Sequence, residues 1–349
     1  MPRISKLPVD AVAQWATVHV RTHSKNFTHA LAENFKVTRA AAATAVKALE
    51  LGGYIVRSGS KTRPVFSPGP SKWIKQSYRL PGLDESALWE RDFSPWIQAS
   101  DNVKNILHHG FTEIVNNAND HSGGSQVHVE FQGTETFCLT VIDDGVGIFR
   151  KIATALKLPD FRLALLELSK GKFTSDKTQH SGEGIFFTSR MFDEFYLDAN
   201  QLTYSKLNTS STDERLDSND FQLVDRDGQP IGTGVMMLID PKSERTSREV
   251  FSRYTPDVPD DFSFSKTTVP VRLASIGNEN LLSRSQAKRL VARIDQFKIV
   301  ELDFTEVPEI GQAFADEVFR VFTNAHPQVQ LIPINANAYV QGMIRRITG

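Results

Sequence analysis

Four short segments in the middle of the chain constrain its fold more than any other feature of the sequence. They occupy residues 113–121 (EIVNNANDH), 143–148 (DDGVGI), 181–185 (SGEGI) and 232–233 (GT). A single Asp-Gly pair is most often an ordinary turn. The four segments, combining carboxylates, amides and glycine pairs in one order, form a much more specific pattern, so we expect the region to fold as one core around a common site.

The first segment is predicted to lie on a helix over residues 111–119, with Ile114 and Ala118 on an apolar stripe. Glu113 and Asn117 are also four residues apart and therefore share a different face of that helix. A carboxylate in this place can orient or deprotonate a water, and an amide oxygen one turn later is a hard ligand suited to Mg²⁺. The alternative is a solvated helix face whose polar residues bind only water.

The second and third segments follow a strand and open a helix. Residues 136–142 have the β-branched and aromatic enrichment of a buried strand, which ends at Asp143. Asp143 can accept a hydrogen bond from the exocyclic amine of adenine, and Gly145 and Gly147 let the backbone approach the base. The third segment precedes a predicted helix over residues 185–192, whose free N–H groups favour phosphate. The spacing and the lysine of a P-loop are absent, so the pattern indicates a different Mg-adenine-nucleotide site.

With these residues the chain resembles the GHKL superfamily of ATPases and kinases over about residues 95–240, and within it the bacterial anti-sigma-factor kinases and histidine-kinase-like regulators. The resemblance implies that Glu113 is the base that activates water, Asn117 the Mg²⁺ ligand, Asp143 the selector of adenine and Thr233 a partner near the adenine. It implies a lid within residues 149–180, with Lys172 as a phosphate contact. The implied ATP- and Mg²⁺-binding set is Asn117, Asp120, His121, Asp143, Gly145, Gly147, Ile148, Lys172, Ser181, Gly182, Glu183, Gly184 and Thr233.

A sensor histidine kinase would carry a phosphoacceptor histidine on a separate dimerising segment upstream. His108 and His109 lie too close to the first segment for that and belong to the helix of Glu113. We therefore interpret them as structural or solvated histidines.

The composition is that of an ordinary globular protein, with 40% apolar and 23% charged residues in a chain of 349, long enough for two or three domains. No apolar run approaches the ~20 residues that span a bilayer, and the N-terminal residues lack the apolar segment of a secretory signal, which predicts a cytoplasmic protein without membrane contact. Cys138 is the only cysteine, so the sequence predicts neither an internal disulfide nor a cysteine-based zinc site.

The net charge of −1 conceals a strong asymmetry along the chain. Residues 1–75 contain twelve Lys and Arg against three Asp and Glu, a net charge of +9, which leaves −10 for residues 76–349. A basic N-terminal module on an acidic body is typical of a protein that contacts nucleic acid through that module.

The same N-terminal residues predict three helices, over residues 9–20, 28–35 and 38–52, followed by two short strands over residues 54–57 and 63–66. Thr38 is a plausible N-cap for the third helix. This order resembles bacterial winged-helix transcription regulators over about 60 residues. The resemblance implies base-edge contacts by Arg39 and Thr44, and phosphate contacts by Lys36, Lys47, Arg57, Lys61 and Arg63. The alternative is that the module binds a protein or an adjoining domain.

After a connector over residues 243–264, strands predicted at 268–273, 299–304 and 329–334 alternate with helices at 283–296 and 311–323, and a last helix covers 337–347. The alternation predicts a small α/β domain, and its order resembles STAS domains. Phosphorylated STAS proteins carry Ser or Thr at the start of the helix after the central strand. Here the matching residues 309–313 (EIGQA) contain no hydroxyl, and Thr305 is the nearest, so phosphorylation of this domain by the same chain is not favoured.

The sequence therefore predicts three domains: a winged helix-turn-helix (residues 1–75), an α+β GHKL (Bergerat) sandwich (85–242) and a small α/β STAS-like domain (265–349). The expected function is a cytoplasmic bacterial regulator that binds Mg-ATP, with slow hydrolysis at most, and couples it to DNA binding. The alternative is a Ser/Thr protein kinase of the anti-sigma-factor type that acts on a partner protein docked on the STAS-like domain. A homodimer is expected by analogy only.

Overall fold

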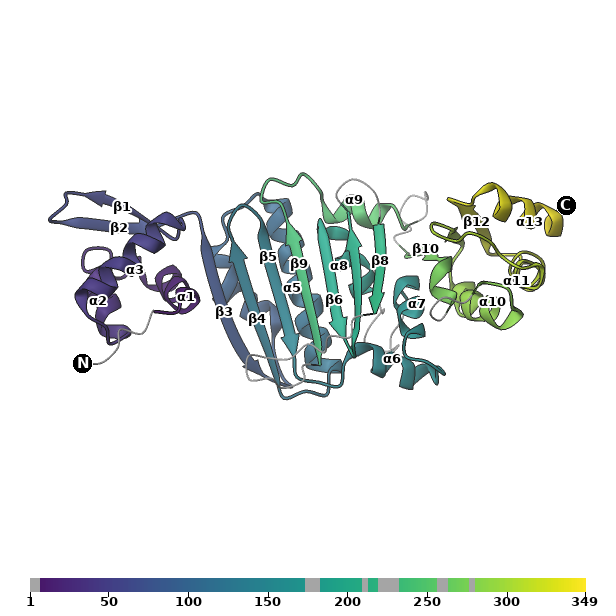
Figure 1. Cartoon of the computed structure of the whole chain (residues 1–349), viewed down its shortest axis with the longest axis horizontal. Coiled ribbons are helices and arrows are strands. Elements are labelled where there is room, and N and C mark those ends of the chain that lie inside the picture. The colour runs from purple at the N-terminus through teal and green to yellow at the C-terminus, as the bar shows by residue number, and fades with distance from the viewer. Residues whose placement is uncertain (1–6, 173–182, 209–212, 219–231, 256–262, 276–279) are drawn as a thin grey trace. The chain divides into compact units, whose positions relative to one another are not determined.

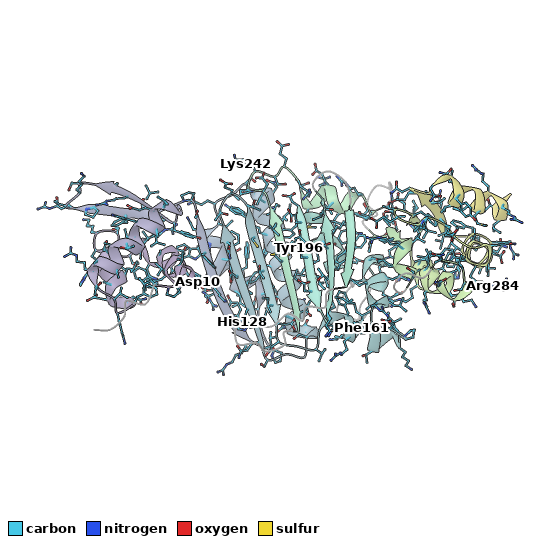
Figure 2. The ribbon with its side chains drawn as sticks, in the orientation of Figure 1. Asp10, His128, Phe161, Tyr196, Lys242 and Arg284 are labelled. Atoms are coloured by element: carbon cyan, nitrogen blue, oxygen red, sulfur yellow. The ribbon has the colours of Figure 1, made fainter. Side chains whose placement is uncertain are left out.

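A computed structural model describes residues 7–172, 183–208, 213–218, 232–255, 263–275 and 280–349. Its elements are shown in Figure 1 and its side chains in Figure 2. The chain forms two compact units, one of residues 1–144 and 234–244 and the other of residues 145–233 and 245–349. In the part of the chain that the structure describes, no helix has both the length and the apolar character needed to cross a membrane.

The first unit begins with three helices and a hairpin, as the sequence predicts. They are α1 (Val9–His19), α2 (Phe27–Asn34), α3 (Arg39–Leu51) and the antiparallel strands β1 (Ile55–Gly59) and β2 (Pro64–Pro68). The predicted cap is confirmed, because the Thr38 hydroxyl accepts a hydrogen bond from the Ala41 amide at 3.2 Å. A compact apolar core, which includes Val12, Phe27, Leu31, Val46, Leu49 and Phe66, joins the helices to the hairpin.

The sheet of the first unit is antiparallel, with strand order β3 (Lys72–Arg79), β4 (Gln126–Gly133), β5 (Phe137–Asp143) and β9 (Thr233–Ile239). Helix α5 (Asp101–His121) packs on β4 and β5 (Figure 1), and the short segments α4 (Glu85–Leu88), η1 (Trp89–Phe93) and η2 (Ser94–Trp96) precede it. The helix predicted over residues 111–119 is thus the second half of a helix of 21 residues. The amide of Trp73 on β3 donates to the Thr17 hydroxyl on α1 at 3.1 Å, which ties the helical module to the edge of this sheet.

The second unit begins with α6 (Ile148–Leu156), α7 (Leu163–Lys170) and α8 (Gly184–Met191), followed by antiparallel strands in the order β6 (Glu194–Ala199), β7 (Leu202–Leu207) and β8 (Asp213–Ser218) and by α9 (Ser247–Ser252). Phe161, in the loop between α6 and α7, is 41% exposed (Figure 2). An aromatic cluster of Phe186, Phe187, Tyr254 and Phe264 joins α8 to the residues after α9.

The C-terminal part of the second unit has a parallel sheet in the order β10 (Lys266–Pro270), β11 (Ile299–Asp303) and β12 (Gln330–Ile334). Its helical segments are η3 (Val271–Ala274), α10 (Arg284–Val291), η4 (Ile294–Gln296), α11 (Gln312–Asp316), η5 (Glu317–Phe322), α12 (Thr323–Ala325) and α13 (Ala338–Thr348). The predicted small α/β domain is confirmed by these elements.

Two predicted boundaries in this domain are wrong. The strand predicted over residues 268–273 ends at Pro270, where a 3₁₀ turn begins. The helix predicted over residues 283–296 ends at Val291, because Ala292 has a non-helical ψ of 125° and Arg293 then adopts a left-handed conformation with φ 64°.

Candidate functional site

The first candidate segment lies on the second half of α5. Buried residues that include Phe111, Ile114, Val115 and Ala118 form the apolar face of this helix. Glu113, Asn117 and Asp120 follow at intervals of four and three residues and form a polar stripe, with His121 beside Asp120. Glu113, Asn117 and His121 are half-buried and Asp120 is exposed. Because residues 113–117 are helical in the structure, Glu113 and Asn117 share one face of α5, as predicted.

Asn119, which the sequence analysis did not single out, fixes the end of this helix. Its side-chain oxygen accepts hydrogen bonds from the amides of Gly82 at 2.8 Å and Leu83 at 3.1 Å, and its amide group donates to Asp120 at 2.8 Å. The loop after β3 is thereby bound to the last turn of α5. This contact gives the polar stripe a fixed position relative to the sheet of the first unit.

The second candidate segment begins at the end of β5, where two adjacent aspartates differ in their surroundings. Asp143 is the last residue of the strand and is 7% exposed. Asp144 is exposed, and its carboxylate accepts hydrogen bonds from the amides of Ser125 at 2.6 Å and Gln126 at 2.9 Å and from the Ser125 hydroxyl at 2.5 Å. Desolvation alone would raise the pKa of Asp144, but these hydrogen bonds outweigh it and hold the pKa below its ordinary value. Asp144 therefore closes a turn, and Asp143 is the candidate for recognition.

The glycine-containing part of this segment, in the second unit, has a defined backbone. Gly147 is buried with φ +83°, and a Cβ there would lie 2.5 Å from the side chain of Asn200. Asn200 donates to the Val146 carbonyl and accepts from the Arg150 amide, both at 3.0 Å. The Thr233 hydroxyl accepts a hydrogen bond from the amide of Ile148, the first residue of α6, at 3.1 Å. Glycine is thus required at 147, where the Asn200 side chain packs against the backbone. The role of Thr233 as a partner near the adenine stays a prediction.

Asn200 was missed by the sequence analysis. It lies with Gln201 in the turn between β6 and β7, and both residues have positive φ values, of 51° and 66°. Asparagine is common in such tight hairpin turns. That signal predicts the turn, but it does not predict the contact with residues 146–150.

Of the predicted phosphate segment, Ser181 and Gly182 lie outside the described residues. Gly184 is the first residue of α8, after the half-buried Glu183. Lys172 is half-buried; its ammonium lies 4.7 Å from the ring centre of Phe297 and 5.4 Å from that of Phe264, and it donates to the Gln296 carbonyl at 3.3 Å. Burial lowers the pKa of Lys172, although Glu183 acts in the opposite direction. The assignment of these residues to phosphate stays a prediction.

The residues predicted to contact DNA are all exposed: Lys36, Arg39, Thr44, Lys47, Arg57, Lys61 and Arg63. Arg57 donates to the Lys61 carbonyl at 3.4 Å, and the Thr44 hydroxyl donates to the Ala40 carbonyl of its own helix at 3.1 Å. Lys72, by contrast, is 5% exposed and donates to the Gly69 carbonyl. The charge available on the surface of the module is therefore smaller than the count of its basic residues.

Within the described ranges, no group of three or more His, Cys, Asp or Glu side chains is placed to hold a metal ion. A groove of about 740 Å³ in the second unit is lined by residues that include Arg150, Lys157 and Phe161.

The C-terminal segment, with parallel strands that alternate with helices, belongs to the class of small α/β domains. Residues 286–341 match the family model of a STAS-like domain of unknown function (DUF4325), so this segment is a STAS-like domain.

No curated protein matches the chain. Among solved structures, the chain is similar to an IcIR transcriptional regulator from Alicyclobacillus acidocaldarius, with 12% identity, 68% of this chain and 89% of that chain covered, and a TM-score of 0.17. A likeness of that size carries no argument about fold or function.

Proposed function

We propose that this chain is a regulator that binds Mg-ATP through a GHKL-type site and couples nucleotide binding to the engagement of DNA by an N-terminal winged helix. The observation that carries the proposal is the polar stripe of α5, a helix that packs on β5, the strand that ends in the buried carboxylate of Asp143. Asp143 stands directly before the glycine-containing turn of residues 145–147, and a carboxylate in this place can accept a hydrogen bond from a donor such as the adenine amine.

The residues present fit Mg-ATP. Asn117 offers a neutral oxygen, which Mg²⁺ accepts together with phosphate oxygens and water. Glu113, one turn earlier, can accept a proton from a water or hold it in place. When bound, Mg-ATP would supply a phosphoanhydride bond, and transfer of its γ-phosphoryl group to water or to a hydroxyl, with ADP as the leaving group, is the chemistry available to these residues.

A route for coupling exists within the first unit. Helix α5 packs on β4 and β5, β3 pairs with β4, and Trp73 on β3 donates to Thr17 on α1. A change in α5 on nucleotide binding can therefore alter the support of the helical module. Coupling requires that Mg-ATP bind two states of the protein with different affinity, since equal affinity would shift no population.

The DNA-binding role is supported by the module itself. Its three helices and hairpin have the order of a winged helix, and α3 exposes Arg39, Thr44 and Lys47. Exposed Arg57, Lys61 and Arg63 on and beside the hairpin are available for phosphate contacts.

A second candidate is a Ser/Thr kinase of the anti-sigma-factor type. The presence of a STAS-like domain favours it, because this domain could serve as the docking surface for the substrate protein. In this chain α11 begins after Gly311, and no hydroxyl lies within residues 309–313. The hydroxyl of Thr305 donates to Asp303 at 2.7 Å. The acceptor under this second function would therefore be on a partner protein.

The test is a titration of the full chain against a labelled DNA fragment from upstream of its own gene, at two salt concentrations, with no nucleotide, Mg-ADP or Mg-ATP. Binding that is salt-sensitive, responds to Mg-ATP and loses that response in Asn117→Ala supports the proposal. DNA affinity that is the same with and without Mg-ATP at fixed salt refutes the coupling. Transfer of label from [γ-³²P]ATP to a protein, instead of release as free phosphate, would favour the kinase.

A further inference from the structure

Lys170, the last residue of α7, is a buried cation with a complete set of partners. Its side chain is 3% exposed, and its ammonium donates to Glu167 at 2.7 Å, to the Arg289 carbonyl at 3.0 Å and to the Ala292 carbonyl at 2.8 Å. A lysine ammonium has three donors, so each of them has an acceptor. Burial lowers the pKa of Lys170, and Glu167 opposes that effect.

Two of these acceptors belong to the STAS-like domain. Arg289 and Ala292 lie in the last turn of α10 and just after it, where carbonyls lack partners within the helix and the helix dipole favours a cation. Lys170 thus caps the C-terminal end of a helix that lies some 120 residues further along the chain.

Further contacts join the same short segment to the STAS-like domain. Arg293 lies 3.6 Å from the second carboxylate oxygen of Glu167 and donates to the Lys172 carbonyl at 3.2 Å. On the other side, the buried Thr267 of β10 donates its hydroxyl to the carbonyl of Lys170 at 2.9 Å. Side chain and backbone of Lys170 are therefore both bound to the C-terminal sheet and helix.

The anchored segment also supports the start of the candidate nucleotide segment. Helix α7 packs against α6, which begins directly after the buried Gly147. The first amide of α6, at Ile148, donates to the Thr233 hydroxyl. Directly after Lys170, Gly171 has φ +96°, and a Cβ there would lie 2.6 Å from Phe186 on α8. The packing leaves little freedom between the STAS-like domain and α6.

We infer that the STAS-like domain controls the nucleotide site, because its docking on Lys170 fixes the position of α7 and, through α7, of α6 and residues 147–148. Docked and displaced positions of α10 would give the Lys170 ammonium two different sets of partners. With α10 docked, the ammonium has all of its acceptors; with α10 displaced, it loses two of them and must reach water. A partner that binds the STAS-like domain and displaces α10 would loosen α6 and weaken nucleotide binding. The effect on nucleotide rests on the function proposed above, whereas the anchoring of α6 does not.

The experiment compares the full-length protein with Lys170→Met, the milder Thr267→Val, and the matched control Lys288→Met, which removes an exposed lysine from the same helix α10. Hydrogen exchange over residues 148–156 without nucleotide measures the anchoring. Calorimetric titration with Mg-ATP measures the nucleotide site. Far-UV circular dichroism tests whether each variant is folded.

We expect Lys170→Met to exchange about tenfold faster over α6, as local opening becomes easier. We also expect it to bind Mg-ATP about tenfold more weakly, in the range typical of coupling between sites. Thr267→Val should change the exchange rate over α6 and the affinity for Mg-ATP in the same directions but by less. Lys288→Met should change neither quantity. If Lys170→Met does not fold, the exchange rate and the Mg-ATP affinity of Thr267→Val test the inference in its place.

Unchanged exchange over α6 in the folded variants overturns the inference. Faster exchange with unchanged Mg-ATP affinity overturns its regulatory part. Faster exchange in a protein whose wild type binds no Mg-ATP supports the anchoring and refutes the proposed nucleotide function instead.

Discussion

The stability of the protein is expected to fall in acid because of His109, which lies on α5 one turn before Glu113. Burial, with a smaller contribution from the neighbouring His108, lowers the pKa of His109 from 6.5 to about 4. Between these two values the unfolded chain binds a proton that the folded chain does not. The contribution of His109 to stability is therefore fully present above pH 6.5 and is lost as the pH falls to 4. A pKa difference of about 2.5 corresponds to about 3 kcal/mol.

The assay is urea denaturation of the wild type and of His109→Gln at several values between pH 7.5 and pH 4. The difference in free energy of unfolding between the two proteins should change by about 3 kcal/mol across this range, with the variant favoured at the acid end. His29→Gln, which removes an exposed histidine from α2, is the control for the loss of one imidazole. A difference between wild type and His109→Gln that does not vary with pH, or an NMR titration that gives His109 a pKa of 6.5 or above, would refute the reasoning.

Three further variants test the site and the module. Gly147→Ala places a Cβ at 2.5 Å from Asn200 in a backbone of φ +83° and should cost about 1–3 kcal/mol in thermal unfolding; an unchanged melting temperature would contradict the need for glycine. Asn117→Ala should abolish Mg-nucleotide binding in calorimetry and leave the melting curve without nucleotide unchanged, so retained affinity would overturn the Mg²⁺ assignment. Lys47→Ala should weaken DNA binding on all sequences and reduce the slope of log K against log salt by about 1, whereas the exposed Lys242→Ala, labelled in Figure 2, should not.

Local signals predicted the elements that carry the candidate residues. The cap at Thr38 and the strand that ends at Asp143 depend on residues next to them in the sequence, and both occur as predicted. The common face of Glu113 and Asn117 follows from helical periodicity alone. The end of α10 was missed, because nothing near Arg293 in sequence marks a left-handed residue there.

Contacts between distant parts of the chain could not be predicted. Asn119 stands in a run of polar residues where any member could have bound the Gly82 loop, and only the fold selects it. Lys170 ends an apolar helix and has the local sequence of an ordinary exposed C-terminal lysine, which is favoured there by the helix dipole. Its burial arises from carbonyls about 120 residues away, and the pattern of one sequence contains no trace of that pairing.

The free energies of their contacts distinguish Lys170, which is held in place, from Lys172, which a ligand can move. Removal of one partner from a buried, hydrogen-bonded ion pair typically costs about 3–5 kcal/mol, and Lys170 is such a partner. Lys172 is half-buried, and its contacts with Phe264 and Phe297 are cation–π interactions of about 0.5–2 kcal/mol. A bound triphosphate can compete for Lys172 at little cost, but it offers nothing that replaces the three acceptors of Lys170. Nucleotide alone is therefore expected to move Lys172 and leave Lys170 in place, and the release of Lys170 requires a partner that acts on α10 itself.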